Sequence, residues 1–345
     1  MKKYKFTNKN ACLVLDDLTS EYFMGAPLEE GCLVVADRLT FFVDARSYHG
    51  VKKSLEEKGV EVRLYSALAD IKEFLSEIGT ECLYLNFAQV SIKRYNEFLS
   101  FGLELKDAEE ILSSFRAIKT KEEKKNLKKA CEIAQNALYK AMEIVRVGIS
   151  ELELKADIEK RILEFGGSAP SFETIVAFGK NSAVPHHKSG TTILQKDMPI
   201  LIDMGAKYKG YCSDITRTFF FGEPTERFVE CYNVVLKANE VAITNIKCKT
   251  LTCDADGFAR KVLSENGLGE YFTHSLGHGV GREVHEFPYL SPKKKAELKK
   301  DMVFTIEPGV YFENEFGVRI EDTVLLTNKG VKRLFTDGKE LKIIK

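Results

Sequence analysis

Acidic residues lie inside apolar, strand-like runs of this sequence, where the interior of a sheet would normally exclude them. Asp203 ends an Ile/Leu-rich run, and Asp214 follows eleven residues later, beyond a turn. If the two runs pair as a hairpin about the midpoint between Tyr208 and Lys209, the two Asp residues become direct cross-strand neighbours, with Cβ atoms about 4.5–5.5 Å apart. Two buried carboxylates at that separation repel each other unless they share a proton or a cation. The spacing therefore predicts a cation between them.

A second pair of acidic residues repeats this pattern. Glu307 and Glu321 are equidistant from Asn314, so a hairpin centred there places two more carboxylates opposite each other. His278 has glycines on both sides, which allow the backbone to approach a bound group closely. Four carboxylates and one imidazole form a five-ligand set for two metal ions. Oxygen donors with a single nitrogen suit Mn²⁺ or Co²⁺, and Zn²⁺ less exclusively.

Each of these residues taken alone has a more ordinary explanation. Asp203 by itself is typical of a turn or a sheet edge, and Glu321 could simply pair with Arg319 or Lys332. His187 is better explained as an exposed or supporting residue than as a metal ligand. The joint pattern favours the metal site, because five of the six histidines also fall within the same half of the chain, between residues 186 and 285.

The length and composition indicate an ordinary globular protein of two domains. The chain has 345 residues, 44% of them hydrophobic and 30% charged, which is enough for two cores. Its 51 basic and 51 acidic side chains give no net charge, and this argues against a nucleic acid or an anionic membrane as partner.

No apolar run is long enough for a transmembrane helix. Residues 1–5 are basic, but the apolar stretch 11–15 is too short for a signal peptide, so a cytoplasmic enzyme is expected.

The first 105 residues alternate strand-like runs with helical ones, which predicts a small α/β domain. The expected strands cover residues 32–36, 40–43, 62–64 and 82–85, and the expected helices cover 51–58, 71–78 and 92–101. The first two strands are predicted to form a hairpin. From residue 106 to 145 the composition shifts to Glu, Lys, Ala and Leu at helical spacing, which predicts one long helix or two.

The remaining residues predict an α+β domain that carries the carboxylates. Ser150 and Glu153 form a capping-box pattern, which starts a helix ending near Phe165. Further helices are expected at about 227–244 and 254–266. Strands of an antiparallel sheet are expected over residues 174–178, 200–204, 212–221, 303–311 and 318–325.

Residues 106–345 resemble the pita-bread metallopeptidases, the M24 family that includes methionine aminopeptidase, aminopeptidase P and prolidase. The resemblance rests on five motifs in the family's order, which are Ile202–Gly205, Ser213–Thr218, His274–Glu286, Thr305–Gly309 and Gly317–Asp322. The whole chain is similar to the Xaa-Pro peptidase branch. The resemblance implies an α+β pita-bread fold for a catalytic domain at 119–345, and a creatinase-like N-terminal α/β domain at 1–118.

The resemblance also implies two divalent metal ions per subunit and assigns their ligands, which are Asp203, Asp214, His278, Glu307 and Glu321. In that assignment Asp214 and Glu321 bridge the two ions, Asp203 binds one, and His278 with Glu307 binds the other. Mn²⁺ is the expected metal, with Co²⁺ or Zn²⁺ as alternatives.

Further residues match family positions that act in catalysis or bind substrate. His285 corresponds to the imidazole that stabilises the tetrahedral oxyanion, and Glu307 to the group that carries a proton from the attacking water to the leaving amine. His186 corresponds to a contact near the leaving nitrogen, and His274 to a wall of the pocket for proline. Arg319 is assigned to the substrate pocket, where it is expected to hold the carboxylates by charge-assisted hydrogen bonds.

One position departs from the prolidase pattern. Prolidase-like members commonly carry an arginine four residues after the position of His285, where it binds the carboxylate of the dipeptide. This sequence has Tyr289 there, which is assigned to substrate binding in its place. The lack of that guanidinium favours an aminopeptidase P-like enzyme, although Lys293–Lys295 could substitute for it. We therefore predict a Xaa-Pro aminopeptidase acting on peptides with proline at the second position. Xaa-Pro dipeptidase (prolidase) is the alternative.

Other proteins of this fold fit less well. Creatinase needs no metal, and a non-catalytic scaffold of the same fold would be expected to have substituted ligands, whereas all five are intact here. Methionine aminopeptidase is disfavoured by the N-terminal domain, which its compact members lack. The turn residues Tyr208 and Tyr211 are either walls of the substrate pocket or simply turn packing. A homodimer is expected from the resemblance alone.

Overall fold

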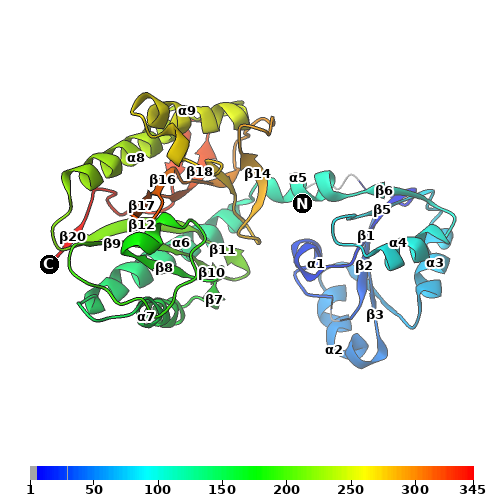
Figure 1. Ribbon diagram of the computed structural model, residues 1–345. Coiled ribbons are helices and arrows are strands. Elements are labelled where there is room, and N and C mark those ends of the chain that lie inside the picture. Colours follow the sequence, from blue (N-terminus) through cyan, green and yellow to red (C-terminus); the bar gives the residue numbers. More distant parts are fainter. Residues whose placement is uncertain (1–5, 29) are drawn as a thin grey trace. The chain divides into compact units, whose positions relative to one another are not determined.

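The computed structural model describes residues 6–28 and 30–345, and it divides the chain into two compact units, unit 1 (residues 1–116) and unit 2 (residues 117–345) (Figure 1). Residues 1–5, considered above as the start of a signal peptide, lie outside the described ranges. Within those ranges, none of the helices combines the length and apolar character that a membrane crossing requires.

Unit 1 contains one six-stranded mixed sheet with the strand order β4-β3-β2-β1-β5-β6. Its elements are β1 (Asn10–Val14), α1 (Asp17–Met24), β2 (Cys32–Val35), β3 (Leu39–Val43), α2 (Ala45–Glu56), β4 (Val60–Leu64), α3 (Leu68–Glu77), β5 (Cys82–Leu85), α4 (Ile92–Leu99), β6 (Glu104–Asp107) and α5 (Glu109–Ala117), which reaches the boundary. The predicted β2–β3 hairpin is confirmed. β1, α1 and β6 were not predicted from the sequence; β6 is a largely charged edge strand.

Two pairs of helices enclose the strands of unit 2. These helices are α6 (Lys121–Ala141), α7 (Glu151–Glu164), α8 (Glu226–Asn245) and α9 (Thr252–Glu265). In Figure 1 the pair α8–α9 lies on the upper side of the strands and the pair α6–α7 on the lower side. The predicted start of α7 is confirmed, because the Ser150 hydroxyl accepts a hydrogen bond from the Glu153 N–H and the Glu153 carboxylate accepts one from the Ser150 N–H.

The strands of unit 2 form several small sheets. The first group consists of β7 (Ala169–Pro170), β8 (Ile175–Phe178), β9 (Met198–Met204), β10 (Ala206–Tyr208), β11 (Tyr211–Cys212), β12 (Ile215–Phe221) and β20 (Ile343–Ile344). The second group consists of β13 (Gly277–Gly279), β14 (Glu286–Leu290), β15 (Val303–Ile306), β16 (Gly309–Phe312), β17 (Phe316–Arg319), β18 (Asp322–Thr327) and β19 (Gly330–Arg333). The order is β20-β12-β9-β8 in one sheet, β14-β13-β15-β18-β19 in another and β11-β10-β7 in a third, and β16 pairs with β17.

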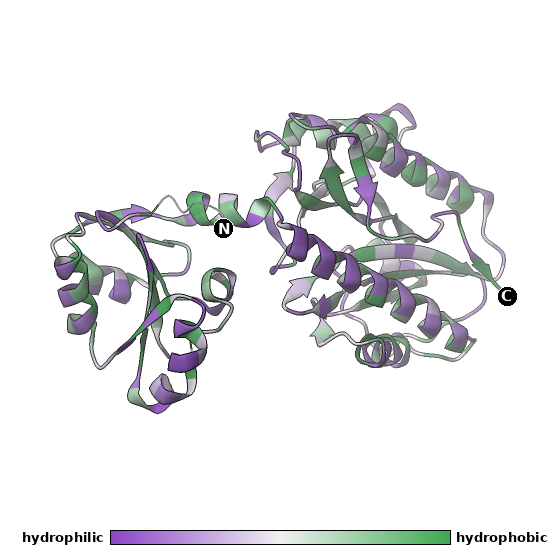
Figure 2. Cartoon of the chain, turned by 180° about the vertical axis from the view of Figure 1, so that it is seen from behind, coloured by the Kyte–Doolittle hydropathy of each residue, from purple (hydrophilic) through white to green (hydrophobic). Residues whose placement is uncertain are grey.

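Each group of strands has its own hydrophobic core. Side chains of α6 and α7 pack with β8, β9 and β12 in one core, and side chains of α8 and α9 pack with β15 to β18 in the other. Figure 2 shows hydrophobic residues concentrated in the strands between the helix pairs, whereas the outer helices carry many hydrophilic ones. Burial of one apolar face of each helix against a sheet is what holds such layers together. The fold class predicted from the sequence is confirmed.

The register of the first acidic hairpin differs from the prediction. Tyr208 pairs with Tyr211, so the turn consists of Lys209 and Gly210, which both have positive φ angles, 48° and 77°. This is the backbone of a type I′ turn, which suits the twist of a two-residue hairpin. The predicted pairing of Asp203 with Asp214 is therefore wrong: β9 and β12 place Asp203 opposite Thr216.

The register of the second acidic hairpin is as predicted, with its centre at Asn314. Phe312 pairs with Phe316 across that centre, and Gly309 pairs with Arg319. The same register continues beyond the hairpin, where Ile306 of β15 pairs with Asp322 of β18. Glu307 and Glu321 occupy matching positions between these two pairs.

Three segments that the sequence predicts as continuous strands are interrupted in the structure. The breaks fall between Cys212 and Ile215, between Ile306 and Gly309, and between Arg319 and Asp322. Asp214, Glu307 and Glu321 each lie in one of these breaks. The acidic residues are thus placed where the backbone leaves regular sheet geometry, which frees their side chains to converge on one point.

Candidate metal centre and active site

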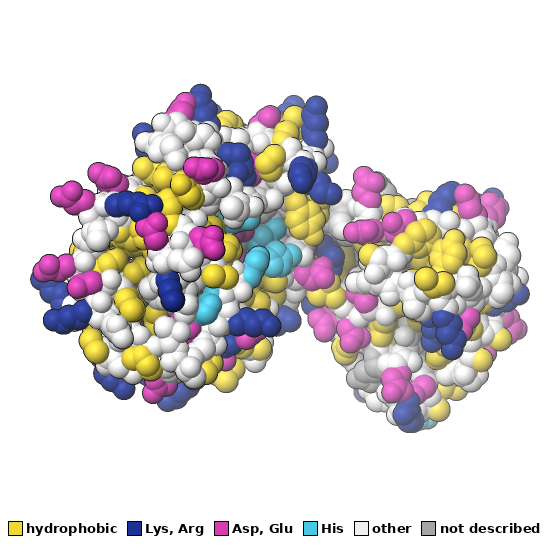
Figure 3. All heavy atoms as spheres, in the orientation of Figure 1, with side chains coloured by type: hydrophobic (Ala, Val, Ile, Leu, Met, Phe, Trp, Pro, Cys, Tyr) yellow, Lys and Arg dark blue, Asp and Glu magenta, His cyan; other side chains and the backbone are white. Residues whose placement is uncertain are grey.

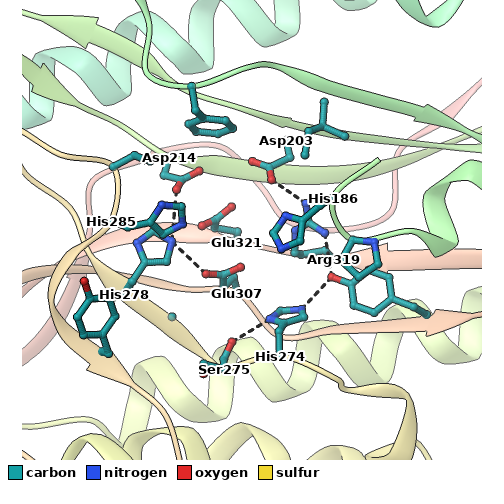
Figure 4. A pocket seen from close by; sticks show the side chains of 17 residues that line it. His186, Asp203, Asp214, His274, Ser275, His278, His285, Glu307, Arg319 and Glu321 are labelled. Carbon is teal, nitrogen blue, oxygen red and sulfur yellow. Dashed lines mark hydrogen bonds and ion pairs between the residues drawn. The ribbon is translucent and has the colours of Figure 1, made fainter. Parts of the chain in front are cut away.

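A pocket of about 330 Å³ in unit 2 is lined by all ten residues that the sequence analysis assigned to the site. These ten are His186, Asp203, Asp214, His274, His278, His285, Tyr289, Glu307, Arg319 and Glu321. Histidine side chains gather in a hollow on the face of unit 2 shown in Figure 3. In Figure 4, His278 and His285 lie on one side of the carboxylates, and His186 and His274 lie on the other.

Carboxylates from both halves of unit 2 converge at the base of the pocket. Asp214 and Glu321 are 4% and 2% exposed, while the side chains of Asp203 and Glu307 are each 16% exposed toward the pocket. The Nε2 atom of His278, on β13, lies 3.3 Å from Glu307 Oε1 and 3.6 Å from Asp214 Oδ2. Ligand atoms of Asp214, His278 and Glu321 all lie within 4.8 Å of one another.

A buried guanidinium organises the other edge of this cluster. Arg319 donates through Nη2 to Asp203 Oδ2 at 2.7 Å, through Nε to Thr216 Oγ1 at 3.1 Å and through Nη1 to Tyr311 Oη at 2.8 Å. The Thr216 hydroxyl in turn donates to Glu321 Oε2 at 2.7 Å. Arg319 therefore fixes Asp203 directly and Glu321 through one intermediate hydroxyl.

The four carboxylates do not share one ionisation behaviour. Burial, followed by the charge of Glu321, raises the pKa of Asp214 well above its usual range. Burial and the charge of Glu307 likewise raise the pKa of Glu321, and burial raises that of Asp203 despite the nearby Arg319. Burial would also raise the pKa of Glu307, but the hydrogen bond and charge of His278 outweigh it and lower that pKa to about 2.

The donor set fits divalent metal ions on three observations. Asp203 Oδ1 is buried and has no hydrogen-bond partner, so one oxygen remains available as a ligand. His278 Nδ1 lies 3.2 Å from the carbonyl of Gly279, and donation from Nδ1–H leaves Nε2 as the free lone pair in the neutral ring. Burial, followed by repulsion from neighbouring carboxylates, raises the pKa values of Asp214 and Glu321, so binding of a cation between them would be favoured.

The glycines around His278 have a different role from the predicted one. A Cβ on Gly277 would lie 2.1 Å from the carbonyl oxygen of Thr305, and one on Gly279 would lie 2.4 Å from that of Phe287. These glycines allow neighbouring strands, rather than a bound group, to approach β13. The β13–β14 register also shifts between His278 and Gly279, an irregularity of the kind found beside active sites.

The histidines lining the pocket differ in environment. The ring of His285 lies 4.0 Å from that of His278 between centroids, and burial, followed by the charge of His278, lowers the pKa of His285 to about 4. His274 Nε2 lies 2.9 Å from Tyr311 Oη, and its Nδ1 lies 2.8 Å from the Ser275 carbonyl. Burial lowers the pKa of His274 as well, so both rings are neutral at neutral pH. His186 is exposed.

Thr216 and Tyr311 contact the acidic cluster through Arg319 but were not predicted from the sequence. Thr216 became the cross-strand partner of Asp203 only when the register was corrected. Tyr311 faces Gly317 across the hairpin, and a Cβ at Gly317 would lie 2.9 Å from the Tyr311 ring. The pairing of a large residue with a glycine is the sequence feature that could have indicated Tyr311.

Three other residues considered from the sequence lie outside the pocket lining. Tyr211 belongs to the hydrophobic core and Tyr208 packs against it. Of the two interpretations given for these tyrosines, this agrees with packing at the turn and not with a wall of the substrate pocket. The Nε2 atom of His187 lies 2.9 Å from the Oε2 atom of the fully buried Glu151, as expected of a supporting residue.

The paired helix layers and the buried acidic cluster define a metal-dependent hydrolase of the pita-bread type. The model of metallopeptidase family M24 matches residues 125–328, more than half of the chain. The chain therefore belongs to this family and is a peptidase. Enzymes of this family depend on divalent metal ions.

Three relatives cover nearly the whole chain. An Xaa-Pro dipeptidase of Pyrococcus furiosus is 37% identical over 345 residues, with 99% of this chain and 98% of the relative covered. The solved structure of an Xaa-Pro dipeptidase from Bacillus anthracis is 32% identical with a TM-score of 0.92, covering 97% of this chain and 95% of that one. An X-Pro aminopeptidase structure from Thermotoga maritima is 30% identical with a TM-score of 0.88, covering 98% of each chain.

The acidic cluster predicts that stabilisation by metal grows with pH. In the metal-free protein the pKa values of Asp214 and Glu321 lie above their unfolded values of 3.8 and 4.5. Their protonation therefore stabilises the fold at low pH, and this contribution is lost as pH rises through the folded-state pKa values. Mn²⁺ replaces those protons, so the gap in Tm between Mn²⁺-loaded and EDTA-treated protein should widen from about pH 5 to about pH 8.

Thermal unfolding across this pH range, with and without EDTA, measures the effect. Metal at about 100 times its Kd stabilises a folded protein by about 2.7 kcal/mol, which is readily visible as a shift in Tm. A gap that stays constant or narrows with rising pH would contradict the ionisation behaviour assigned to Asp214 and Glu321.

Proposed function

We propose that this chain is an Xaa-Pro dipeptidase, which hydrolyses the bond between an N-terminal residue and a C-terminal proline. The observation that carries the proposal is the pocket, whose lining combines the candidate metal ligands with the apolar side chains of Phe172, Ile175 and Pro185. The names of the Pyrococcus and Bacillus relatives support it. They favour the alternative of the sequence analysis over its main prediction, the Xaa-Pro aminopeptidase.

In this proposal two divalent ions are held by Asp203, Asp214, His278, Glu307 and Glu321, with Mn²⁺ as the expected metal. When bound, they lower the pKa of a water molecule and polarise the scissile carbonyl. Glu307 is proposed to accept the proton of the attacking water and to pass it to the leaving nitrogen. Its carboxylate is deprotonated at neutral pH and is therefore in the state that accepts a proton.

The three histidines of the pocket lining that are not proposed as ligands are proposed to contact the substrate. Arg319 is proposed to position a metal ligand. His285 donates an N–H to the developing oxyanion, for which a neutral imidazole is suited. His186, exposed in the pocket lining, contacts the substrate near the leaving nitrogen. His274, fixed between Tyr311 and the Ser275 carbonyl, forms a wall for proline. Arg319 holds Asp203 in place.

The aminopeptidase remains a second candidate because of Tyr289. This side chain is 43% exposed, lines the pocket and lies opposite His278 on the neighbouring strand. Among the described residues that line the pocket, Arg319 is the one Lys or Arg, and it is already bonded to Asp203. A free carboxylate on proline would thus have to be bound by imidazole or hydroxyl groups, and a longer peptide avoids that need.

Comparing peptides of different length tests the choice between the two candidates. We expect kcat/KM for Ala-Pro to exceed that for Ala-Pro-Ala by about tenfold or more in the presence of Mn²⁺, since about 1.4 kcal/mol of binding to a terminal carboxylate gives that factor. Ala-Pro-amide, which lacks the carboxylate, should resemble the tripeptide. Ala-Ala serves as the control without proline.

Equal or faster cleavage of the tripeptide would overturn the dipeptidase proposal in favour of the aminopeptidase. The predicted creatinase-like character of residues 1–118, the homodimer and the cytoplasmic location remain proposals that rest on the resemblance and on the sequence.

A further inference from the structure

The two glutamates of the site lie in two strand breaks that face each other. These breaks, between Ile306 and Gly309 and between Arg319 and Asp322, are called the two bends below. Regular pairing stops at Ile306 with Asp322 and resumes at Gly309 with Arg319. In the gap between these pairs, the N–H of Glu307 donates to the carbonyl of Leu276 at 2.9 Å. The N–H of Glu321 donates to the carbonyl of Thr216 at 3.1 Å. Each glutamate is therefore anchored through its N–H by a different segment, Glu307 by the residue before β13 and Glu321 by β12.

One side chain of α8 anchors the carbonyl side of both bends. Asn239 is fully buried, and its Nδ2 donates to the carbonyl oxygen of Ile306 at 2.9 Å and to that of Ile320 at 3.2 Å. These are the residues immediately before Glu307 and Glu321. A single amide group thus links the two segments that carry opposing carboxylates, and buried carbonyls require such partners.

The orientation of this amide is fixed by a buried lysine. Lys339 Nζ donates to Asn239 Oδ1 at 2.6 Å and lies 3.7 Å from Asp322 Oδ2. An ammonium group can only donate and a carbonyl can only accept. The Asn239 oxygen must therefore face Lys339, and both of its N–H groups must face the two bends.

We propose that Asn239, oriented by Lys339, is a positioning residue that sets the separation of Glu307 and Glu321 and thereby the affinity for the metal ions. This inference rests on the proposed metal ligands. Asn239 itself touches neither metal nor substrate and acts through the backbone of the two bends. Groups that orient metal ligands commonly change metal affinity by about 10- to 100-fold when they are removed.

Metal titration of the Asn239→Leu variant tests the proposal. This substitution keeps the approximate volume but removes both donors. We expect the Kd of the EDTA-stripped protein for Mn²⁺, measured calorimetrically well below the Tm, to rise about 10- to 100-fold. KM for Ala-Pro should stay near its original value, and kcat should recover when Mn²⁺ is raised to saturation. Asn239→Gln, which keeps the amide, should restore part of the affinity.

Two further variants separate positioning from stability. Val235→Ala, one turn earlier on α8 and in the same core, should lower the Tm without changing the Kd for Mn²⁺. Adding Lys339→Met to Asn239→Leu removes the lysine that would otherwise lack its acceptor, and the loss of affinity should persist. An unchanged Kd in Asn239→Leu, with a Tm loss like that of Val235→Ala, would overturn the proposal. If the unaltered protein itself bound no Mn²⁺, the proposed metal centre would fail instead.

Discussion

Replacing Asp214 by Asn is expected to abolish metal binding and to lower kcat/KM for Ala-Pro by about a thousandfold or more. Asp214 lies in the strand break with ligand atoms of His278 and Glu321 within 4.8 Å, and we propose it as a metal ligand. An amide keeps the shape but removes the negative charge. Loss of about 4 kcal/mol of transition-state stabilisation, of the order that a catalytic metal supplies, corresponds to that thousandfold decrease.

Metal content by mass spectrometry and steady-state kinetics measure the two effects together. Asp254→Asn, an exposed acidic residue at the start of α9, is the matched control and should change neither. The metal-free Asp214→Asn protein should have a higher Tm than the metal-free original at about pH 8, because one of the mutually repelling buried charges is gone. Full activity in this variant would disprove the role of Asp214 as a ligand.

Features determined by neighbouring residues were predicted from the sequence. The capping box of Ser150 and Glu153 gave the start of α7, because both of its hydrogen bonds are made within four residues. The centre of the second hairpin at Asn314 was also predicted, since the acidic residues flank it symmetrically. In both cases the determining interactions are close in the chain.

The interruptions of the strands were not predicted, and they depend in large part on contacts between residues that are distant in sequence. The bends that carry Glu307 and Glu321 are anchored by the carbonyls of Leu276 and Thr216, which lie far away in sequence. Around Glu321 most residues are apolar or β-branched, so their local preference is for a continuous strand. After Glu307, by contrast, Pro308 and Gly309 are a local signal for a break that was not used in the prediction. Tertiary hydrogen bonding overrides the strand preference at Glu321.

The first hairpin shows how one turn changes the geometry of a site. A two-residue turn at Lys209 and Gly210 moves the register so that Thr216, rather than Asp214, faces Asp203. Asp214 still reaches the cluster, but it does so from a break between β11 and β12. Asp203 and Asp214 do line the same pocket, as predicted, but they are not cross-strand neighbours.

Some residues of the candidate site could be predicted from the sequence and others could not. The acidic residues stood out because four carboxylates in apolar runs demand a cation, whereas the roles of the histidines came from the resemblance to a family. Asn239 gave no signal, since an asparagine in an amphipathic helix has no feature that predicts bonds to Ile306 and Ile320. Net charge was equally uninformative, because the zero total of the chain conceals a buried acidic cluster.

Replacing His285 by Ala is expected to lower kcat by about 100- to 1000-fold while leaving metal content and KM nearly unchanged, as found for the loss of one oxyanion donor. The five proposed ligands do not include this ring, which lies beside His278 with 4.0 Å between the ring centroids. Burial and the charge of His278 lower its pKa to about 4. The imidazole is therefore neutral at working pH and can donate an N–H as charge develops on the carbonyl oxygen.

Three comparisons make this prediction specific to an oxyanion donor. His285→Gln retains an N–H donor and should recover part of kcat, while His49→Ala, an exposed histidine of unit 1, should have no effect. The pH profile of kcat should show no ionisation of His285 between about pH 5 and pH 8, since its pKa of about 4 keeps it neutral throughout. Equal losses of Mn²⁺ and of kcat in His285→Ala would instead make His285 a metal ligand, because a donor that acts only in the transition state contributes nothing to the binding of metal in the resting enzyme.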